Sequence, residues 1–201
     1  MKKLVSLALA AVLAVSAVGC GSSSDSSSST ADSAQSTEAA ADGATFKIGG
    51  IGPITGGAAI YGQAVMNAAQ MAVDKINADG GINGYQVEFR FEDDEHDAEK
   101  SVNAYNTLKD WGMQMLMGTV TSTPCTAVSA KTEEDNMFQL TPSGSAVESI
   151  APANAFRVCF SDPNQGTASA QYIGENKLAN KVAVIYNSSD VYSSGIYQTF
   201  A

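Results

Sequence analysis

Apolar residues from position 45 onward alternate between the spacing of strands and the spacing of helices. Segment 45–53, TFKIGGIGP, predicts a short apolar strand that runs into a glycine-rich turn. Segment 63–77 predicts an amphipathic helix whose apolar face comprises Val65, Ala69, Ala72, Val73 and Ile76. The glycine-rich stretch 80–84 ends this helix.

The alternation of strand and helix continues as far as residue 140. The elements predicted there are a strand at 85–91, a helix at 97–111, a strand at 113–117, a helix at 124–136 and a strand at 137–140. Strands that alternate with helices through short turns build a parallel sheet. The sequence therefore predicts an α/β fold in which helices cover both faces of a parallel sheet.

A further strand and helix pattern begins near residue 156. Asp162 followed by Pro163 predicts a helix start, with Asp162 as the N-cap and Pro163 in the first helical position. Segment 181–186, KVAVIY, predicts a buried strand, and a helix begins at 193–201.

One strand and one helix cannot bury their own apolar faces. We therefore predict an N-terminal lobe at 45–161 and the start of a second, similar but incomplete lobe at 162–201. On this interpretation the chain is truncated and is the N-terminal part of a longer protein.

The first twenty residues have the pattern of an export signal. Two lysines precede an apolar stretch at 4–18, which is shorter and richer in alanine than a membrane span. Residues 17–20, AVGC, resemble the lipobox of bacterial lipoproteins, in which the cysteine is diacylated and becomes the new N-terminus. Cys20 is therefore the predicted lipidation site, and an ordinary signal cleaved near Ala17 is the alternative.

Residues 21–44 follow the signal and contain nine serines but no large apolar side chain. Such a composition cannot bury enough apolar surface to offset the entropy lost on ordering. We expect a disordered, Ser-rich tether between the membrane and the folded part. A lipid on Cys20 would anchor the protein outside the cytoplasmic membrane without spanning it.

The charge balance argues against nucleic acid as a partner. The formal net charge of the chain is −10, and removal of residues 1–20 would take away two lysines and no acid, giving −12. Phosphate binding requires clustered Lys and Arg, as does attachment to an acidic membrane surface. Cys125 and Cys159 lie in a compartment that permits disulfides, and their separation in sequence leaves open whether they pair or remain two buried thiols.

Ligands of open parallel sheets bind at the carboxyl ends of the strands. The loop at 118–124 leaves a predicted strand and enters a predicted helix, with Ser122 or Thr123 as N-cap and Pro124 in the first helical position. Free amides and the helix dipole there favour an anion, and the uncharged hydroxyls would not repel a carboxylate. The alternative is that these hydroxyls only cap the helix.

Two further loops reach the same edge of the predicted sheet. In the loop at 141–147, Ser145 and Glu148 match a capping box, a structural role that competes with ligand binding by Ser145. The loop at 51–62 lacks the glycine spacing of nucleotide sites. Tyr61 at its end either forms a wall of a ligand pocket or packs structurally.

Metal and catalytic chemistry receive little support from the sequence. The acidic run at 92–97 lacks the spacing of a calcium loop, and its His96 is the only histidine, so a solvated strand end that caps the next helix is the favoured interpretation. No serine or cysteine lies in a recognisable nucleophile motif. We therefore expect a protein that is not an enzyme and uses no cofactor.

Several stretches of the chain resemble one protein family. They are IGPITGGAAIYGQ, DKINADGGINGYQVEF, FEDDEHD, GTVTSTPCTAVS, FQLTPSGSAV and FRVCFSDPNQGTASAQYI. Together, over residues 45–201, they resemble the leucine/isoleucine/valine-binding proteins of ABC importers, which are extracellular solute-binding proteins of the type I periplasmic-binding fold. The resemblance implies two α/β lobes, joined by three crossovers, that close on an amino acid and deliver it to a membrane permease.

The resemblance also implies the residues that bind the ligand. The serine of the first strand-to-helix site falls on Ser122, beside Thr123, and the second anchoring loop falls on Ser143, Gly144 and Ser145. Aromatic residues of the ligand pocket fall on Tyr61 and, with a length difference of one residue, on Tyr192 of the second lobe. The family's acidic partner for the ligand's ammonium falls beyond residue 201.

A disulfide of some family members joins two positions that are occupied here by His96 and Thr121. The favoured ligand is a branched-chain or other small apolar amino acid. Urea, another short amide and an aromatic acid are alternatives, because relatives of this fold bind them. A lipid-anchored sensor that responds to a ligand without transporting it is a further alternative.

Overall fold

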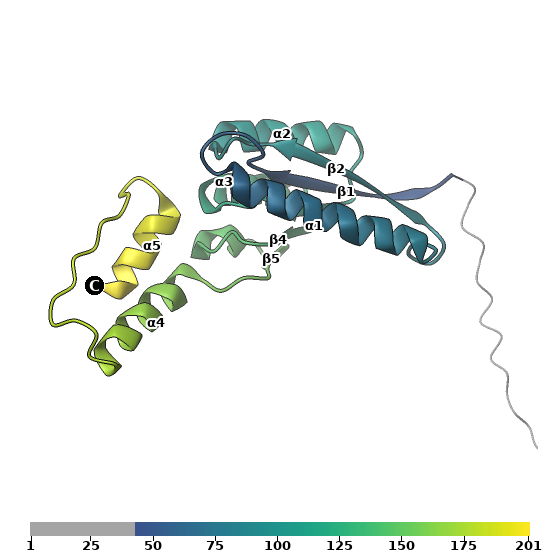
Figure 1. Ribbon diagram of the computed structural model, residues 1–201. Coiled ribbons are helices and arrows are strands. Elements are labelled where there is room, and N and C mark those ends of the chain that lie inside the picture. The colour runs from purple at the N-terminus through teal and green to yellow at the C-terminus, as the bar shows by residue number, and fades with distance from the viewer. Residues whose placement is uncertain (1–42) are drawn as a thin grey trace, which may run out of the picture. The chain divides into compact units, whose positions relative to one another are not determined.

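Five parallel strands form a single sheet in the order β2-β1-β3-β4-β5 (Figure 1). The structure is a computed structural model and describes residues 43–201. The strands are β1 (Thr45–Gly52), β2 (Gln86–Asp93), β3 (Met115–Gly118), β4 (Gln139–Thr141) and β5 (Ala155–Arg157). The predicted α/β fold with a parallel sheet is confirmed.

The helices follow the strands in the predicted alternation. They are α1 (Ala59–Ala78), α2 (Ala98–Asp110), α3 (Ser122–Glu134), the short 3-10 helix η1 (Val147–Ile150), α4 (Asp162–Glu175) and α5 (Val191–Phe200). The helices α4 and α5 pack side by side (Figure 1). The 3-10 turn η1 between β4 and β5 was not predicted from the sequence.

The main core lies between the sheet and the helices α2 and α3. The buried residues that form it are Ile51, Ala104, Tyr105, Leu108, Met113, Leu116 and Val128. Ile51 and Leu116 come from the two central strands, and the alternation of side chains along a strand directs both into this layer. The helix α1 runs along β1 and β2, where the Asn77 side chain bonds to the backbone nitrogen and oxygen of Val87 at 2.7 and 2.9 Å.

The strand order places a switch point beside β1. The chain leaves β1 toward β2 on one side, and after α2 it returns to β3 on the other side of β1. Loops that follow β1 and β3 therefore diverge at the carboxyl edge of the sheet, and such a position is where open α/β sheets bind ligands. The two loops that meet this condition begin at Pro53 and Thr119.

Most boundaries differ from the prediction by a few residues. The helix predicted from residue 63 begins at Ala59, and Ala72, which was assigned to its apolar face, is exposed. The N-cap of α4 is Ser161, whose hydroxyl accepts from the amide of Asn164, so the assignment of Asp162 as N-cap was wrong. Ser and Asp cap helices about equally well, and the chain here uses the residue one position earlier.

The strand predicted at 181–186 is absent from the structure. Residues 182–187 have no regular structure, and residues 181–186 are exposed. A parallel strand needs neighbours for its backbone hydrogen bonds. Among residues 43–201, every strand belongs to the sheet formed by β1 to β5, and none of them pairs with this segment.

Several predictions concern residues outside the described part of the chain. The signal at 1–20, the lipid on Cys20 and almost the whole tether at 21–44 lie there. Within residues 43–201, no helix has the length and apolar character needed to cross a membrane. The division between lobes at 161 and 162 stays a prediction.

Candidate functional site

The helix α3 begins with free backbone donors at the carboxyl edge of the sheet. Its N-cap is Thr121, not Ser122 or Thr123 as predicted, and Pro124 occupies the third helical position. The Thr121 side chain makes no capping hydrogen bond. No acceptor among residues 43–201 pairs with the amides of Ser122 and Thr123. The helix start therefore keeps the donors and the positive dipole end that favour an anion.

The Ser122 hydroxyl is held in an orientation that suits donation. Its oxygen accepts from the amides of Ser145 and Ala146, both at 3.2 Å, and the residue is only 3% exposed. A serine hydroxyl has two acceptor lone pairs and one proton. Because the two amides use the lone pairs, the proton remains for an acceptor. A carboxylate beside the start of α3 would meet this need.

Side-chain hydrogen bonds fix the loop after β4 against the loop after β3. The Thr141 hydroxyl donates to the carbonyl of Thr119, and the Ser143 hydroxyl donates to the carbonyl of Val120, both at 2.6 Å. The Gly144 amide donates to the Thr141 hydroxyl at 2.8 Å. The groups at Ser143 and Gly144 thus have partners within the protein, and their role in ligand binding stays a prediction.

Ser145 is not the cap of a helix. The turn η1 has Ala146 as its N-cap, with no side-chain capping bond, so the predicted capping box with Glu148 was wrong. A single 3-10 turn does not present the third-position amide that such a box requires. Ser145 is 4% exposed, and its carbonyl accepts from Arg157 Nη1 at 2.8 Å. Helix capping, the role that was expected to compete with ligand binding by Ser145, is therefore absent at η1.

A contact joins the start of α3 to the start of α5. The Thr123 hydroxyl donates to Asp190 Oδ1 at 3.3 Å, and Asp190 Oδ2 accepts from the amide of Ser193 at 2.9 Å. Asp190 is the N-cap of α5. Tyr192 follows in the first turn of this helix and is 41% exposed. The predicted residue of the second lobe thus lies on an element that contacts Thr123.

Tyr61 lies in the first turn of α1 and is 64% exposed. The loop before it is held by Asp93, whose Oδ1 accepts from the amide of Ile54 at 2.9 Å and whose Oδ2 accepts from the Thr55 hydroxyl. Burial raises the pKa of Asp93, but these hydrogen bonds and one from the Glu95 amide outweigh it and hold the pKa below its usual range. Sequence reasoning missed this positioning role, and the acidic run was the only signal for it.

Two other acids of the run at 92–97 differ in their surroundings, since Asp97 caps the helix α2 and Asp94 is buried. Asp97 is the N-cap of α2 and accepts from the amide of Lys100 at 2.9 Å, as expected. Asp94 is fully buried, so the interpretation of the whole run as solvated was wrong. Its burial raises its pKa to about 6, although the His96 amide donates to its Oδ1 at 2.9 Å.

The two positions assigned by resemblance to a disulfide are in contact. His96 Nδ1 and Thr121 Oγ1 are 2.9 Å apart and form a hydrogen bond. Cys125 and Cys159 are free thiols in this structure, the first buried and the second half-buried. Burial raises the pKa of the Cys125 thiol. Among residues 43–201, no group of three or more His, Cys, Asp or Glu side chains is arranged to hold a metal ion.

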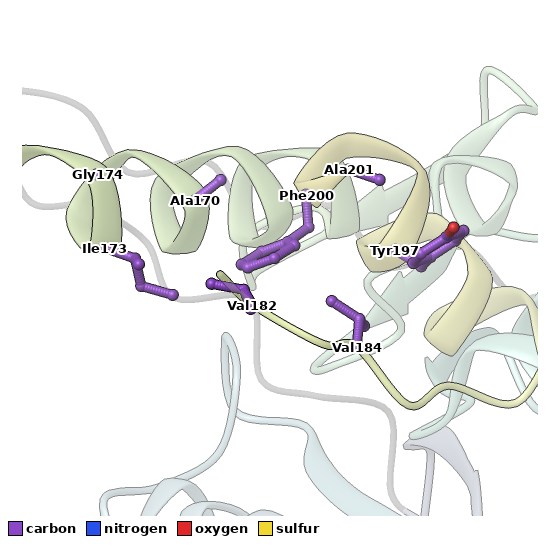
Figure 2. Close-up of a pocket in the computed structure, with 8 residues that line it drawn as sticks. All are labelled: Ala170, Ile173, Gly174, Val182, Val184, Tyr197, Phe200 and Ala201. Atoms are coloured by element: carbon purple, nitrogen blue, oxygen red, sulfur yellow. The ribbon is translucent and has the colours of Figure 1, made fainter. Parts of the chain in front are cut away.

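An apolar cavity of about 510 Å³ lies away from these loops, between α4, α5 and the irregular segment after α4. Figure 2 shows its lining, which comprises Ala170, Ile173, Gly174, Val182, Val184, Tyr197, Phe200 and Ala201. None of the predicted ligand-binding residues takes part. The cavity adjoins the segment that was expected to form a strand, and we attribute it to the lack of strand pairing there.

Comparison with known proteins identifies the family. A family model described as periplasmic binding protein matches residues 45–200. The chain belongs to this periplasmic binding protein family. The Leu/Ile/Val-binding protein homolog 3 of Brucella melitensis is 34% identical over 164 residues, covering 81% of this chain and 44% of the relative. The Leu/Ile/Val-binding protein BraC3 of Rhizobium johnstonii is 34% identical over 159 residues, covering 78% and 43%.

A solved structure agrees with this assignment to the periplasmic binding proteins. It is the branched-chain amino acid transporter substrate binding protein LivJ from Streptococcus pneumoniae, in complex with isoleucine. The two folds superpose with a TM-score of 0.74 at 29% sequence identity, over 78% of this chain and 46% of LivJ. The chain thus spans less than half the length of the relatives that it matches.

Proposed function

We propose that this periplasmic binding protein captures a small apolar α-amino acid between two lobes and delivers it to an ABC permease. Residues 45–161 form the first lobe, and residues 162–201 begin the second. Its relatives are Leu/Ile/Val-binding proteins and a branched-chain amino acid transporter component, and this supports a branched-chain amino acid as the ligand. The protein makes and breaks no bond of its ligand.

The observation that carries the proposal is the donor cluster at Ser122. Two free amides, at Ser122 and Thr123, and a hydroxyl that can only donate converge at the switch point of the sheet. Such a cluster matches the two oxygens of an α-carboxylate. Urea and short amides carry no negative charge, so the helix dipole would favour them less.

Isothermal titration of the full-length protein tests the ligand class. We expect heat of binding with leucine, isoleucine or valine, and much weaker binding of urea, acetamide and benzoate. The titrations use the same protein preparation, and circular dichroism verifies that it is folded. Binding of urea or benzoate without binding of any of the three amino acids would overturn the choice of ligand.

The proposed location is the outer side of the cytoplasmic membrane, with a lipid anchor on Cys20. The support is the sequence of residues 1–20, where two lysines, an apolar stretch and the AVGC motif stand in the order of a lipoprotein signal. Replacement Cys20→Ala in the producing cell should move the protein from the membrane fraction to the soluble fraction. Replacement Ser23→Ala, in the tether, is the control, and equal membrane retention of both variants would contradict the anchor.

A further inference from the structure

The hydroxyl of Thr121 does not cap the helix that follows Thr121. This residue is the N-cap of α3, and its backbone has the extended conformation (φ −114°, ψ 152°) that N-cap residues adopt. An N-cap threonine ordinarily accepts a hydrogen bond from the amide of the second or third helical residue. No such bond is formed here, although the backbone is in place for it. A group outside the helix therefore directs this hydroxyl.

Only one amide is within the capping range of the Thr121 hydroxyl. The second and third helical residues are Thr123 and Pro124, and proline has no backbone N–H. The carbonyl of Thr121 is fixed by the amide of Cys125 at 3.0 Å and by the hydroxyl of Thr119 at 2.9 Å, so the side chain is the part that can turn. A turn toward the helix would take the Thr123 amide, one of the two amides proposed above for the ligand's carboxylate.

His96 holds the Thr121 hydroxyl away from the helix. Its Nδ1 lies 2.9 Å from Thr121 Oγ1, and the two atoms form a hydrogen bond. A threonine hydroxyl donates as well as accepts, so this bond forms with either tautomer of the imidazole. The contact joins the turn after β2 to the start of α3. The imidazole of His96 and the amide of Thr123 are thus competing partners of one hydroxyl.

The backbone of the turn after β2 places the imidazole. Glu95 and His96 have φ angles of +48° and +63°, in the left-handed region that residues with a Cβ seldom adopt. The amide of His96 donates to Asp94 Oδ1 at 2.9 Å, and the amide of Glu95 donates to Asp93 Oδ1 at 3.0 Å. Two carboxylates therefore stabilise a backbone conformation that is unfavourable by itself. In this conformation the side chain of His96 reaches Thr121.

We propose that His96 is a positioning residue for ligand binding, because it prevents Thr121 from capping α3 and so keeps the Thr123 amide available. The inference rests on the proposed function, in which that amide binds the ligand's carboxylate. Without His96 the hydroxyl of Thr121 turns to the Thr123 amide, and the ligand then has to displace it. A typical N-cap hydrogen bond corresponds to a ratio of about five in an equilibrium constant, and leucine should bind more weakly by that factor.

A double-mutant cycle tests this competition. The first substitution is His96→Gly, which removes the imidazole and tolerates the left-handed backbone. The second is Thr121→Val, which removes the hydroxyl but keeps a branched side chain of similar size. Titration calorimetry of the full-length proteins should give about fivefold weaker leucine binding for His96→Gly alone. In the Thr121→Val background, His96→Gly should change the dissociation constant by less than about twofold, because no hydroxyl competes for the amide.

Two further variants separate the role of the imidazole from that of the backbone turn. His96→Asn keeps a side-chain hydrogen-bonding group near the place of Nδ1, and asparagine adopts the left-handed conformation readily, so leucine binding should stay within about twofold of wild type. Glu95→Gly is the matched control at the neighbouring left-handed residue, whose exposed carboxylate pairs with Lys100 at 2.6 Å. It should also bind leucine within about twofold of wild type, because an exposed ion pair contributes little.

Amide hydrogen exchange, measured by NMR, tests the competition without any ligand. In His96→Gly the Thr123 amide should exchange about fivefold more slowly than in wild type, because the Thr121 hydroxyl then protects it. Equal exchange rates in the two proteins would overturn the inference, as would equal weakening of leucine binding by His96→Gly with and without the Thr121 hydroxyl. Failure of the wild-type protein to bind any branched-chain amino acid would instead overturn the proposed function, and the exchange rates would still decide whether His96 controls the cap.

Discussion

The buried acid Asp94 should make the free energy of unfolding fall as the pH rises, whereas its neighbour Asp93 should make it rise. Asp94 is fully buried after β2, and one of its oxygens, Oδ2, has no donor among residues 43–201. Its pKa in the folded protein is raised to about 6 from an ordinary value of 3.8. A pKa difference of one unit corresponds to about 1.4 kcal/mol. The difference between the folded and the ordinary pKa of Asp94 therefore corresponds to about 3 kcal/mol in the free energy of unfolding.

The sign follows from the direction of the shift. A raised pKa means that the folded protein binds the proton more tightly than the unfolded chain does. The contribution of Asp94 to stability is therefore fully present below about pH 3.8 and is lost as the pH rises through about 6. The Asp94→Asn variant lacks this titration. Its free energy of unfolding, minus that of the wild type, should rise by about 3 kcal/mol between pH 3.5 and pH 7.

Urea denaturation of the full-length proteins at a series of pH values measures this difference. The matched control is Asp93→Asn, one residue away. Hydrogen bonds hold the pKa of Asp93 below its usual range, so its stabilisation is present at neutral pH and is lost on acidification. The control should therefore lose stability relative to wild type as the pH rises. A flat difference for Asp94→Asn, or a change of the same sign in both variants, would refute the reasoning.

Two further predictions concern the packing of α4 on α5 and a side-chain hydrogen bond of Tyr105. Gly166 on α4 faces α5, and a Cβ there would overlap Thr199 and the Ile196 carbonyl, so Gly166→Ala should destabilise the contact of the two helices by about 1–3 kcal/mol. Gly174→Ala on the same helix enters open space and should stabilise by up to about 1 kcal/mol. Equal effects of the two substitutions in thermal unfolding would contradict the packing of α4 on α5. Tyr105→Phe removes a hydrogen bond to a carboxylate and should cost about 1–3 kcal/mol in urea unfolding, and no loss would show that this bond is not formed.

The order of the elements could be predicted because each depends on local spacing. The alternation in β2 and the capping of α2 by Asp97 are contained in short stretches of sequence. Exact helix starts were harder, since Thr121, Ser122 and Thr123 are all good N-caps and only the backbone conformation selects Thr121. The strand expected at 181–186 depends on partner strands, which no local pattern supplies.

The candidate site was predicted in outline but not in its hydrogen bonds. Strand polarity and the small hydroxyl residues indicated the loop that carries Ser122. The use of its oxygen by the amides of Ser145 and Ala146 depends on two loops that are distant in sequence. From the sequence, Asp94 was interpreted as a solvated acid and Asp162 as a helix N-cap. Both are buried, because the packing of other elements around a residue decides its burial.

A crystal structure of the full-length protein with leucine or isoleucine tests the central claim most directly. We expect the ligand's carboxylate oxygens to lie about 3 Å from the amide nitrogens of Ser122 and Thr123 and from the Ser122 hydroxyl. The uncharged donors at the start of α3 would then be satisfied by the ligand. A bound amino acid whose carboxylate lies elsewhere, with these donors turned to solvent, would contradict the account.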